Sequence, residues 1–220
     1  MTVTINEKLN LDFGLDFIHK EIGEAEAKTY YVDIPLSDGS IDLTESLSPI
    51  IRYNNREITM VFEIRKDRTE WAQLMSDLNQ EWNGRQVKVV FSDDTEYYWR
   101  GRASVGALED HGFTAGVTVT VNAEPYKRTV APEIYGPFTV AAGTSETVTI
   151  ANTHIKSWPS FYCSVSNVKV IYDGDNYGYT GYMSHTIYGL ELPNGIKTLT
   201  LENGWNTAIV CYIELEGGDL

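Results

Sequence analysis

The stretch Asp33-Ile34-Pro35-Leu36-Ser37-Asp38-Gly39-Ser40-Ile41-Asp42-Leu43-Thr44, continuing to Arg52-Tyr53-Asn54-Asn55-Arg56, decides how the first half of the chain is organised. The alternation over residues 30–34 predicts a half-buried strand, and residues 37–40 are typical of a turn because Gly39 tolerates a positive φ. The apolar residues that follow keep neither a helical nor a strand period; they are Ile41, Leu43, Leu47, Ile50 and Ile51. A long connection with its own apolar side chains is usually functional. We predict an extended arm over about 37–56 that packs on a neighbouring molecule; an ordinary hairpin with a wide loop is the alternative.

The rest of residues 1–128 is predicted to be mainly β with one helix. Alternating apolar residues indicate strands over about 3–5, 57–65, 86–91, 97–103 and 113–123, whereas residues 21–28 are charged and predict a loop. The helix is expected over about 68–82, where one apolar stripe is formed by Trp71, Leu74, Met75, Leu78 and Trp82. Gly84 suits the left-handed position after its end. The two tryptophans are expected to pack on the sheet as core.

Composition changes near residues 127–132, which predicts two domains, 1–128 and 129–220. The first carries 22 acidic and 14 basic residues, and the second carries 9 acidic and 3 basic residues. The second has no helical pattern and shows strand-like runs at 138–141, 146–151, 160–165, 168–172, 186–192, 197–201 and 207–215. Tight turns are predicted at Asn194-Gly195 and at 202–204. This spacing is typical of a β-sandwich of jelly-roll type.

The charge and the apolar pattern exclude several classes of protein. A net charge of −14 argues against nucleic-acid binding and against an anionic membrane anchor, since both need clustered Lys and Arg. No run approaches the roughly 18 apolar residues of a membrane span, and the start of the chain lacks the pattern of a signal peptide. Cys163 and Cys211 lie in apolar, strand-like runs. We expect buried reduced thiols in a protein kept in a cytoplasm, with a disulfide as the minority alternative.

With these residues described, residues 30–128 resemble the distal tail proteins of long-tailed phages that infect Gram-positive hosts. The resemblance lies in the order of the Asp-Ile-Pro strand, Asp38-Gly39-Ser40-Ile41-Asp42-Leu43-Thr44, Tyr53 to Arg56, the Trp-bearing helix, Tyr97-Tyr98-Trp99-Arg100-Gly101-Arg102 and Pro125-Tyr126-Lys127. The second domain is similar in architecture to the galectin-like domain that often completes this family.

The resemblance implies a virion structural protein without catalytic, metal or cofactor groups. It implies a six-fold ring at the tip of a non-contractile tail, assembled in the host bacterial cytoplasm. Its partners would be other copies of the chain, the tail tube protein, the tail-associated lysin or fibre hub, and receptor-binding proteins. DNA would pass through the lumen without being bound. The subunit-interface candidates are Asp38, Ile41, Leu43, Leu47, Ile50, Tyr53 and Arg56.

No motif supports catalysis, and the second domain contains two other candidate sites. Tyr177, Tyr179 and Tyr182 lie in a Gly-rich region, and such aromatic rings can stack on a sugar, so the alternative function is a carbohydrate-binding module for a host-surface glycan. Residues Asp173–Asn176 begin like a calcium loop, but Tyr177 and Ser184 occupy ligand positions, so the EF-hand pattern fails and only a looser calcium site stays open.

Overall fold

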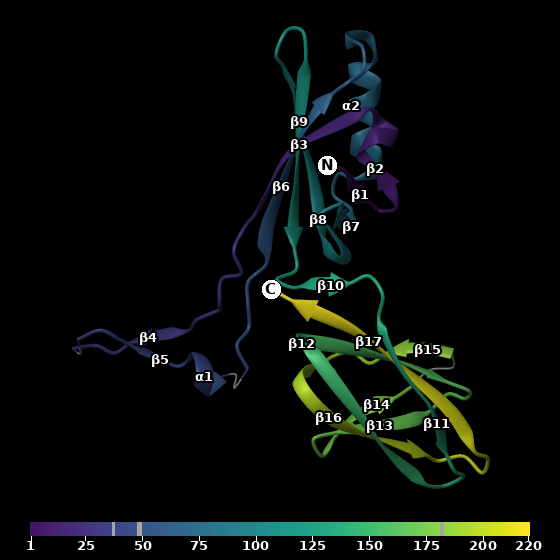
Figure 1. Cartoon of the computed structure of the whole chain (residues 1–220). Helices are drawn as coiled ribbons and strands as arrows, with labels where there is room; N and C mark the ends of the chain where they lie inside the picture. The colour runs from purple at the N-terminus through teal and green to yellow at the C-terminus, as the bar shows by residue number, and fades with distance from the viewer. Residues whose placement is uncertain (37, 48–49, 181–182) are drawn as a thin grey trace. The chain divides into compact units, whose positions relative to one another are not determined.

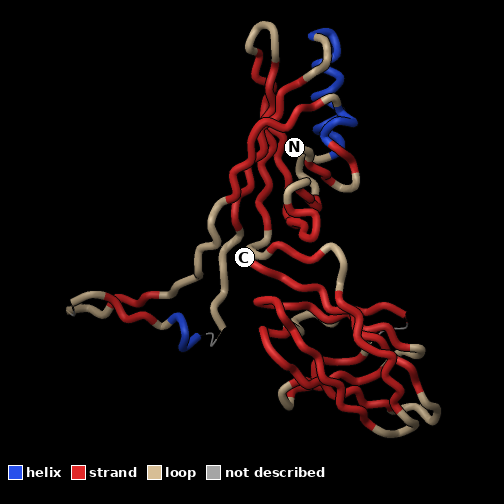
Figure 2. Tube along the Cα trace, in the orientation of Figure 1, coloured by secondary structure: helices blue, strands red, loops and turns tan. Residues whose placement is uncertain are grey.

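The computed structural model describes residues 1–36, 38–47, 50–180 and 183–220. The chain divides into two compact units, Met1–Lys127 and Arg128–Leu220, and each has a hydrophobic core of its own. Figure 1 labels the elements, and Figure 2 shows that strands predominate in both units. The prediction of a mainly β protein is confirmed.

The first unit contains strands, one full-length helix and three short helical or 3-10 segments. In chain order they are β1 (Val3–Ile5), β2 (Lys8–Leu9), the 3-10 turn η1 (Asn10–Phe13), β3 (Leu15–Ile22), β4 (Tyr31–Asp33), β5 (Ser40–Asp42), α1 (Thr44–Leu47), β6 (Arg56–Ile64), the 3-10 turn η2 (Arg68–Glu70), α2 (Trp71–Glu81), β7 (Gln86–Phe91), β8 (Asp94–Asp110), β9 (Ala115–Ala123) and β10 (Lys127–Thr129), whose last residues belong to the second unit.

One antiparallel sheet forms the body of this unit, in the order β2-β1-β7-β8-β9-β6-β3. The sheet curls so that β3 approaches β7. Lys20 of β3 reaches Asp93 in the turn after β7, and its Nζ atom lies 4.2 Å from the ring centroid of Phe91. Alternate residues of the strands therefore enclose one core. In β6, for example, the residues that enter it are Ile58, Met60, Phe62 and Ile64.

Helix α2 covers this core with the predicted stripe. Trp71, Leu74, Leu78 and Trp82 are buried, and Met75 packs at the margin. The Phe13 ring lies edge-on to Trp82, with 4.9 Å between the ring centroids. The expectation that both tryptophans are core residues is confirmed, and Gly84 follows the helix with φ of 70° as expected.

The second unit continues with strands alone. They are β11 (Glu133–Val140), β12 (Ser145–Cys163), β13 (Val168–Tyr172), β14 (Asp175–Tyr179), β15 (Met183–Thr186), β16 (Leu192–Asn203) and β17 (Ile209–Asp219). Residues 187–191, predicted as part of a strand, lie outside these elements.

Strand β12 belongs to both sheets of this unit. Its first part pairs with β16 in the sheet β14-β13-β16-β12, and its last part pairs with β17 and β15 in the sheet β15-β12-β17-β11. Apolar residues of both sheets meet in one core, so the arrangement is a β-sandwich. The sequence predicted two separate strands here, and that was wrong.

Two local features explain why β12 continues. Asn152, where the register shifts, donates to the carbonyl of Leu192 and accepts from the Ser157 hydroxyl, which stabilises the irregularity. Pro159 lies opposite Leu215, between the end of the β16 ladder at Ser157 and the start of the β15 ladder at Ser160. Proline therefore sits where no strand needs its missing N–H.

Two turn-like sequences differ from expectation. Asn194-Gly195 lies inside β16 and pairs with the bulged part of β12, so the predicted turn is absent there. Asp173 and Gly174 have φ of 51° and 83° and connect β13 to β14 by a two-residue hairpin turn. That turn accounts for the sequence that suggested calcium. Within the described residues, no group of three or more His, Cys, Asp or Glu side chains gathers to hold a metal ion.

Candidate functional site: an extended arm

Residues 24–55 of the first unit form an arm that leaves the sheet between β3 and β6 (Figure 1). Backbone hydrogen bonds join its two legs: Gly23 N donates to Glu57 O, Asn54 N to Glu26 O, and Lys28 N to Arg52 O, each over 2.8 Å. Further out, β4 and β5 pair as a two-stranded ribbon. The arm therefore begins about thirteen residues earlier than the predicted 37–56, because residues 24–36 form its first leg.

No arm residue that the structure describes is buried. Eight large apolar side chains of the arm are exposed by between 43% and 109%: Tyr30, Tyr31, Ile34, Leu36, Ile41, Leu47, Ile50 and Ile51. The strand predicted over 30–34 forms at β4, but its predicted half-burial was wrong, since among the described residues β4 pairs with β5 alone. Apolar side chains gathered on a segment without a core are typical of a surface that binds another molecule.

The outer part of the arm is held by local hydrogen bonds. The Thr44 N–H donates to Asp42 Oδ1 over 2.9 Å at the start of α1, and hydrogen bonds from the hydroxyl and the N–H of Thr44 lower the pKa of Asp42. Tyr30 N donates to the Thr44 hydroxyl, which fastens α1 to the first leg. Leu36, with φ of 69°, is held fully exposed in the left-handed region that a leucine rarely adopts.

The arm is also acidic. Between Tyr30 and Ile51 the sequence has four carboxylates, Asp33, Asp38, Asp42 and Glu45, and no Lys or Arg. All four residues are exposed. The arm therefore suits a partner surface that is apolar and carries basic residues.

Aromatic contacts anchor the base of the arm. The Tyr53 ring lies edge-on to Tyr126, 5.9 Å between centroids. Arg56 is buried at the start of β6 with its guanidinium 4.9 Å from the Trp99 ring centroid. Burial lowers the pKa of Arg56, and its Nε and Nη2 atoms have no hydrogen-bond partner among the residues that the structure describes.

The structure places six of the seven predicted interface residues along the arm. Asp38, Ile41, Leu47 and Ile50 are exposed, Leu43 and Tyr53 are half-buried, and Arg56 is buried in the body. Sequence reasoning missed the exposed residues of the first leg: Tyr30, Tyr31, Ile34 and Leu36. The sequence feature that could have identified these residues is the Asp38-Gly39 turn, because a tight turn pairs the strand before it with the strand after it.

The predicted glycan-binding tyrosines are not equivalent. Tyr177 packs at the margin of the second core, 6.2 Å between its ring centroid and that of Tyr172. Tyr179, at the end of β14, is exposed. Tyr182 lies outside the described residues. Glycan binding by this group stays a prediction.

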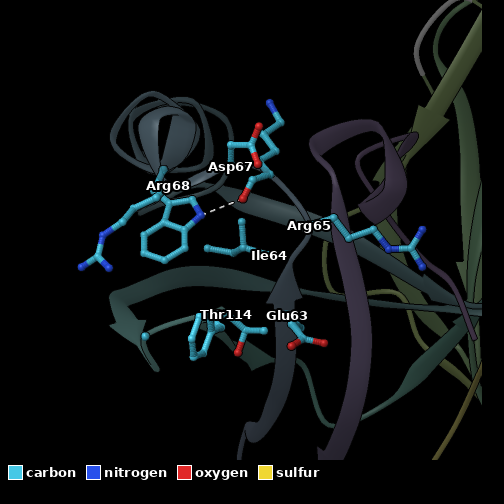
Figure 3. Close-up of a pocket in the computed structure, with 10 residues that line it drawn as sticks. Glu63, Ile64, Arg65, Asp67, Arg68 and Thr114 are labelled. Carbon is cyan, nitrogen blue, oxygen red and sulfur yellow. Dashed lines mark hydrogen bonds between the residues drawn. The ribbon is translucent and has the colours of Figure 1, made fainter.

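A second candidate is a pocket between the end of β6, the start of α2 and the β8–β9 turn (Figure 3). Trp71 Nε1 donates to the Lys66 carbonyl across it over 2.8 Å. Its two arginines are already ion-paired within the chain, Arg65 with Asp16 and Arg68 with Asp110. The positive charges of the two arginines are therefore neutralised by carboxylates, so the pocket is not suited to bind an anion. The arm is the stronger candidate.

Comparison with solved structures shows that nearly the whole chain is similar to a protein of known structure. The crystal structure of the SPP1 Dit (gp 19.1) protein, described as a paradigm of the hub adsorption apparatus in Gram-positive infecting phages, matches with a TM-score of 0.57 and 16% identity. The match covers 97% of this chain and 98% of that one. The chain has the Dit fold. The predicted likeness to distal tail proteins is confirmed at the level of the fold.

Other comparisons add less. The structure of the phage p2 baseplate in its activated conformation with Sr matches with a TM-score of 0.46 and 7% identity, over 98% of this chain and 97% of that one. Searches of protein-family models and of curated proteins give no match. Among the helices that the structure describes, none has the length and apolar character needed to cross a membrane.

Proposed function

We propose that this protein is a structural, non-enzymatic hub component of a phage tail tip. It assembles as a six-subunit ring in the virion that joins the tail tube to the lysin or fibre hub and to receptor-binding proteins. The Dit fold over nearly the full chain supports the tail hub role. The observation that carries the ring is the arm, because its exposed apolar side chains find no core within the described parts of their own chain.

The arm of one subunit lies on the next subunit in a head-to-tail contact. Such a contact uses two different surfaces, the arm and its receiving surface, so that repetition closes a ring when the rotation allows it. Burial of the exposed apolar side chains favours association, with a gross gain of about 25 cal/mol per Å² of apolar surface, from which the entropy cost of joining two molecules is subtracted. The carboxylates of the arm select a receiving surface with basic residues.

The test is the mass of the purified full chain by light scattering after gel filtration. Wild type is expected as six copies of the 24.8 kDa chain, in rings with a central hole by negative-stain microscopy. A triple variant, Ile41→Ser, Leu47→Ser and Ile51→Ser, is expected to be monomeric with an unchanged melting temperature, since these side chains are exposed in the single chain.

The matched control replaces three exposed isoleucines outside the arm, Ile18→Ser, Ile134→Ser and Ile196→Ser. This variant is expected to assemble as wild type does. Equal loss of assembly in both variants, or assembly that survives the arm substitutions, would contradict the role of the arm. A wild-type chain that stays monomeric at high concentration would count against the ring.

A further inference from the structure

Two thiols face each other inside the second unit. Cys163 of β12 and Cys211 of β17 are 3% and 0% exposed, and their Sγ atoms are 2.6 Å apart. Both are free cysteines, and they are the chain's two cysteines. The sequence placed both in strands but left their pairing open, because 48 positions separate them.

The strand register shows that this pair has the geometry of a cross-strand disulfide. Cys163 lies directly opposite Cys211 in the antiparallel β12–β17 ladder. At the next pair, Ser164 N donates to Val210 O over 2.9 Å, so Ser164–Val210 is the hydrogen-bonded type. Pairs alternate along such a ladder, which makes Cys163–Cys211 a non-hydrogen-bonded pair, with Cα atoms about 4.5 Å apart. That separation lies within the range that disulfides span, roughly 4.4 to 6.8 Å.

We propose that Cys163 and Cys211 form a redox site that peroxide-class oxidants convert into an intrachain disulfide joining β12 to β17. The biological role of this disulfide rests on the proposed function, since a virion leaves a reducing cell for oxidising surroundings. The chemistry itself needs neither the ring nor the arm.

The reaction balances with one peroxide for each pair of thiols. The Cys163 thiolate attacks one peroxide oxygen, the O–O bond breaks, hydroxide leaves, and Cys163 becomes a sulfenic acid. The Cys211 sulfur then attacks the Cys163 sulfur, the S–O bond breaks, and the second oxygen leaves as water. Two thiols are oxidised by two electrons, and the peroxide is reduced to two waters.

The surroundings favour Cys163 as the first nucleophile. The hydrogen bond from the Cys211 thiol lowers the pKa of Cys163, and the same contact raises the pKa of Cys211. The thiolate is the reactive form of a cysteine.

The stabilising effect follows from the position of the pair. The bond would close a long loop, which restricts the unfolded chain more than a short loop does. The bond would join two neighbouring strands of one sheet, so it opposes separation of β12 from β17.

The experiment uses the full chain, purified with reductant, desalted, and treated with hydrogen peroxide before quenching. Intact mass is expected to fall by two hydrogen atoms, and alkylation in denaturant is expected to drop from two labelled cysteines to none. Peptide mapping without reductant should join the segments of Cys163 and Cys211. The melting temperature of the second unit should rise by on the order of 10 °C and return with dithiothreitol.

Cys163→Ala and Cys211→Ala are the controls, each compared with itself before and after peroxide, so that any destabilisation by the substitution cancels. Neither is expected to gain thermal stability. The proposal is overturned if peroxide leaves both wild-type thiols open to alkylation, or adds oxygen atoms without removing hydrogens. These readouts lie within one chain, so they distinguish failure of this proposal from failure to form a ring.

Discussion

Gly101, in β8, lies where this strand passes close to the backbone of β9. A Cβ atom at this position would lie 2.4 Å from the Asn122 carbonyl oxygen and 2.6 Å from the Cα atom of Ala123. Both are backbone atoms of β9, so relief requires the strands to move apart. Gly101→Ala is therefore expected to lower the free energy of unfolding by at least about 2 kcal/mol, measured by urea denaturation.

Gly204→Ala is the matched control, because a Cβ there meets nothing within 4 Å. Its effect should stay within about 0.5 kcal/mol. Equal urea midpoints for the two variants would show that β8 and β9 separate at little cost.

Asn203 shows how a single amide can fix a turn. Its Nδ2 group donates to the carbonyls of Val140, Ala141 and Thr207 over 3.1, 3.0 and 2.9 Å, and its Oδ1 accepts from Trp205 N. Asn203→Asp keeps the acceptor but turns a second oxygen toward three carbonyls.

The charged form of that carboxyl is disfavoured when folded, so its pKa rises above the unfolded value of about 3.9. The variant should therefore be closest to wild type below pH 4 and lose stability as the pH rises through the raised pKa. Unfolding free energies measured from pH 3 to pH 8 provide the check, and a deficit that does not grow with pH would contradict the assignment.

At the scale of elements, one contact of the first unit joins β3 to the turn after β7, although β3 and β7 lie far apart in the order of the sheet. Lys20 Nζ lies 2.7 Å from both carboxylate oxygens of Asp93, and this hydrogen bond lowers the pKa of Asp93 below its ordinary value of 3.8. A lowered pKa contributes stability above the unfolded pKa, and that stability is lost as the pH falls through the folded pKa.

Lys20→Met keeps the packing on Phe91 and removes the charge. Because Asp93 is half exposed, the expected loss at pH 7 is small, about 0.5 kcal/mol. The two proteins should become equally stable at the pH at which Asp93 is protonated in the folded protein, below its ordinary pKa of 3.8. If the difference in unfolding free energy between the two proteins is unchanged at that pH, the loss of stability comes from packing and not from the ion pair.

At the scale of the whole molecule, the sequence predicted the elements whose burial pattern is regular. Trp71, Leu74, Leu78 and Trp82 located α2, and alternation located β6 and β7 within a residue. Prediction from the sequence failed where the neighbouring strand decides the structure. The sequence predicted separate strands over 146–151 and 160–165, but Pro159 lies within β12 at a change of partner strand, which only the fold reveals.

The arm was predicted in part for the same reason. Its second leg was recognisable because Ile41, Leu47 and Ile50 follow no period, whereas the first leg resembled an ordinary half-buried strand. A pattern of alternation shows that a strand has an apolar face, but it does not show whether that face is covered by the same chain. The proposed covering surface belongs to another subunit.

The continuity of β12 has a mechanical consequence. In a sandwich whose sheets share no strand, the two sheets are joined by side-chain packing and by loops. Here the sheets share one strand of 19 residues, and a load applied to either sheet passes along a covalent backbone into the other. Under tension, the second unit is therefore expected to respond as one stiff body.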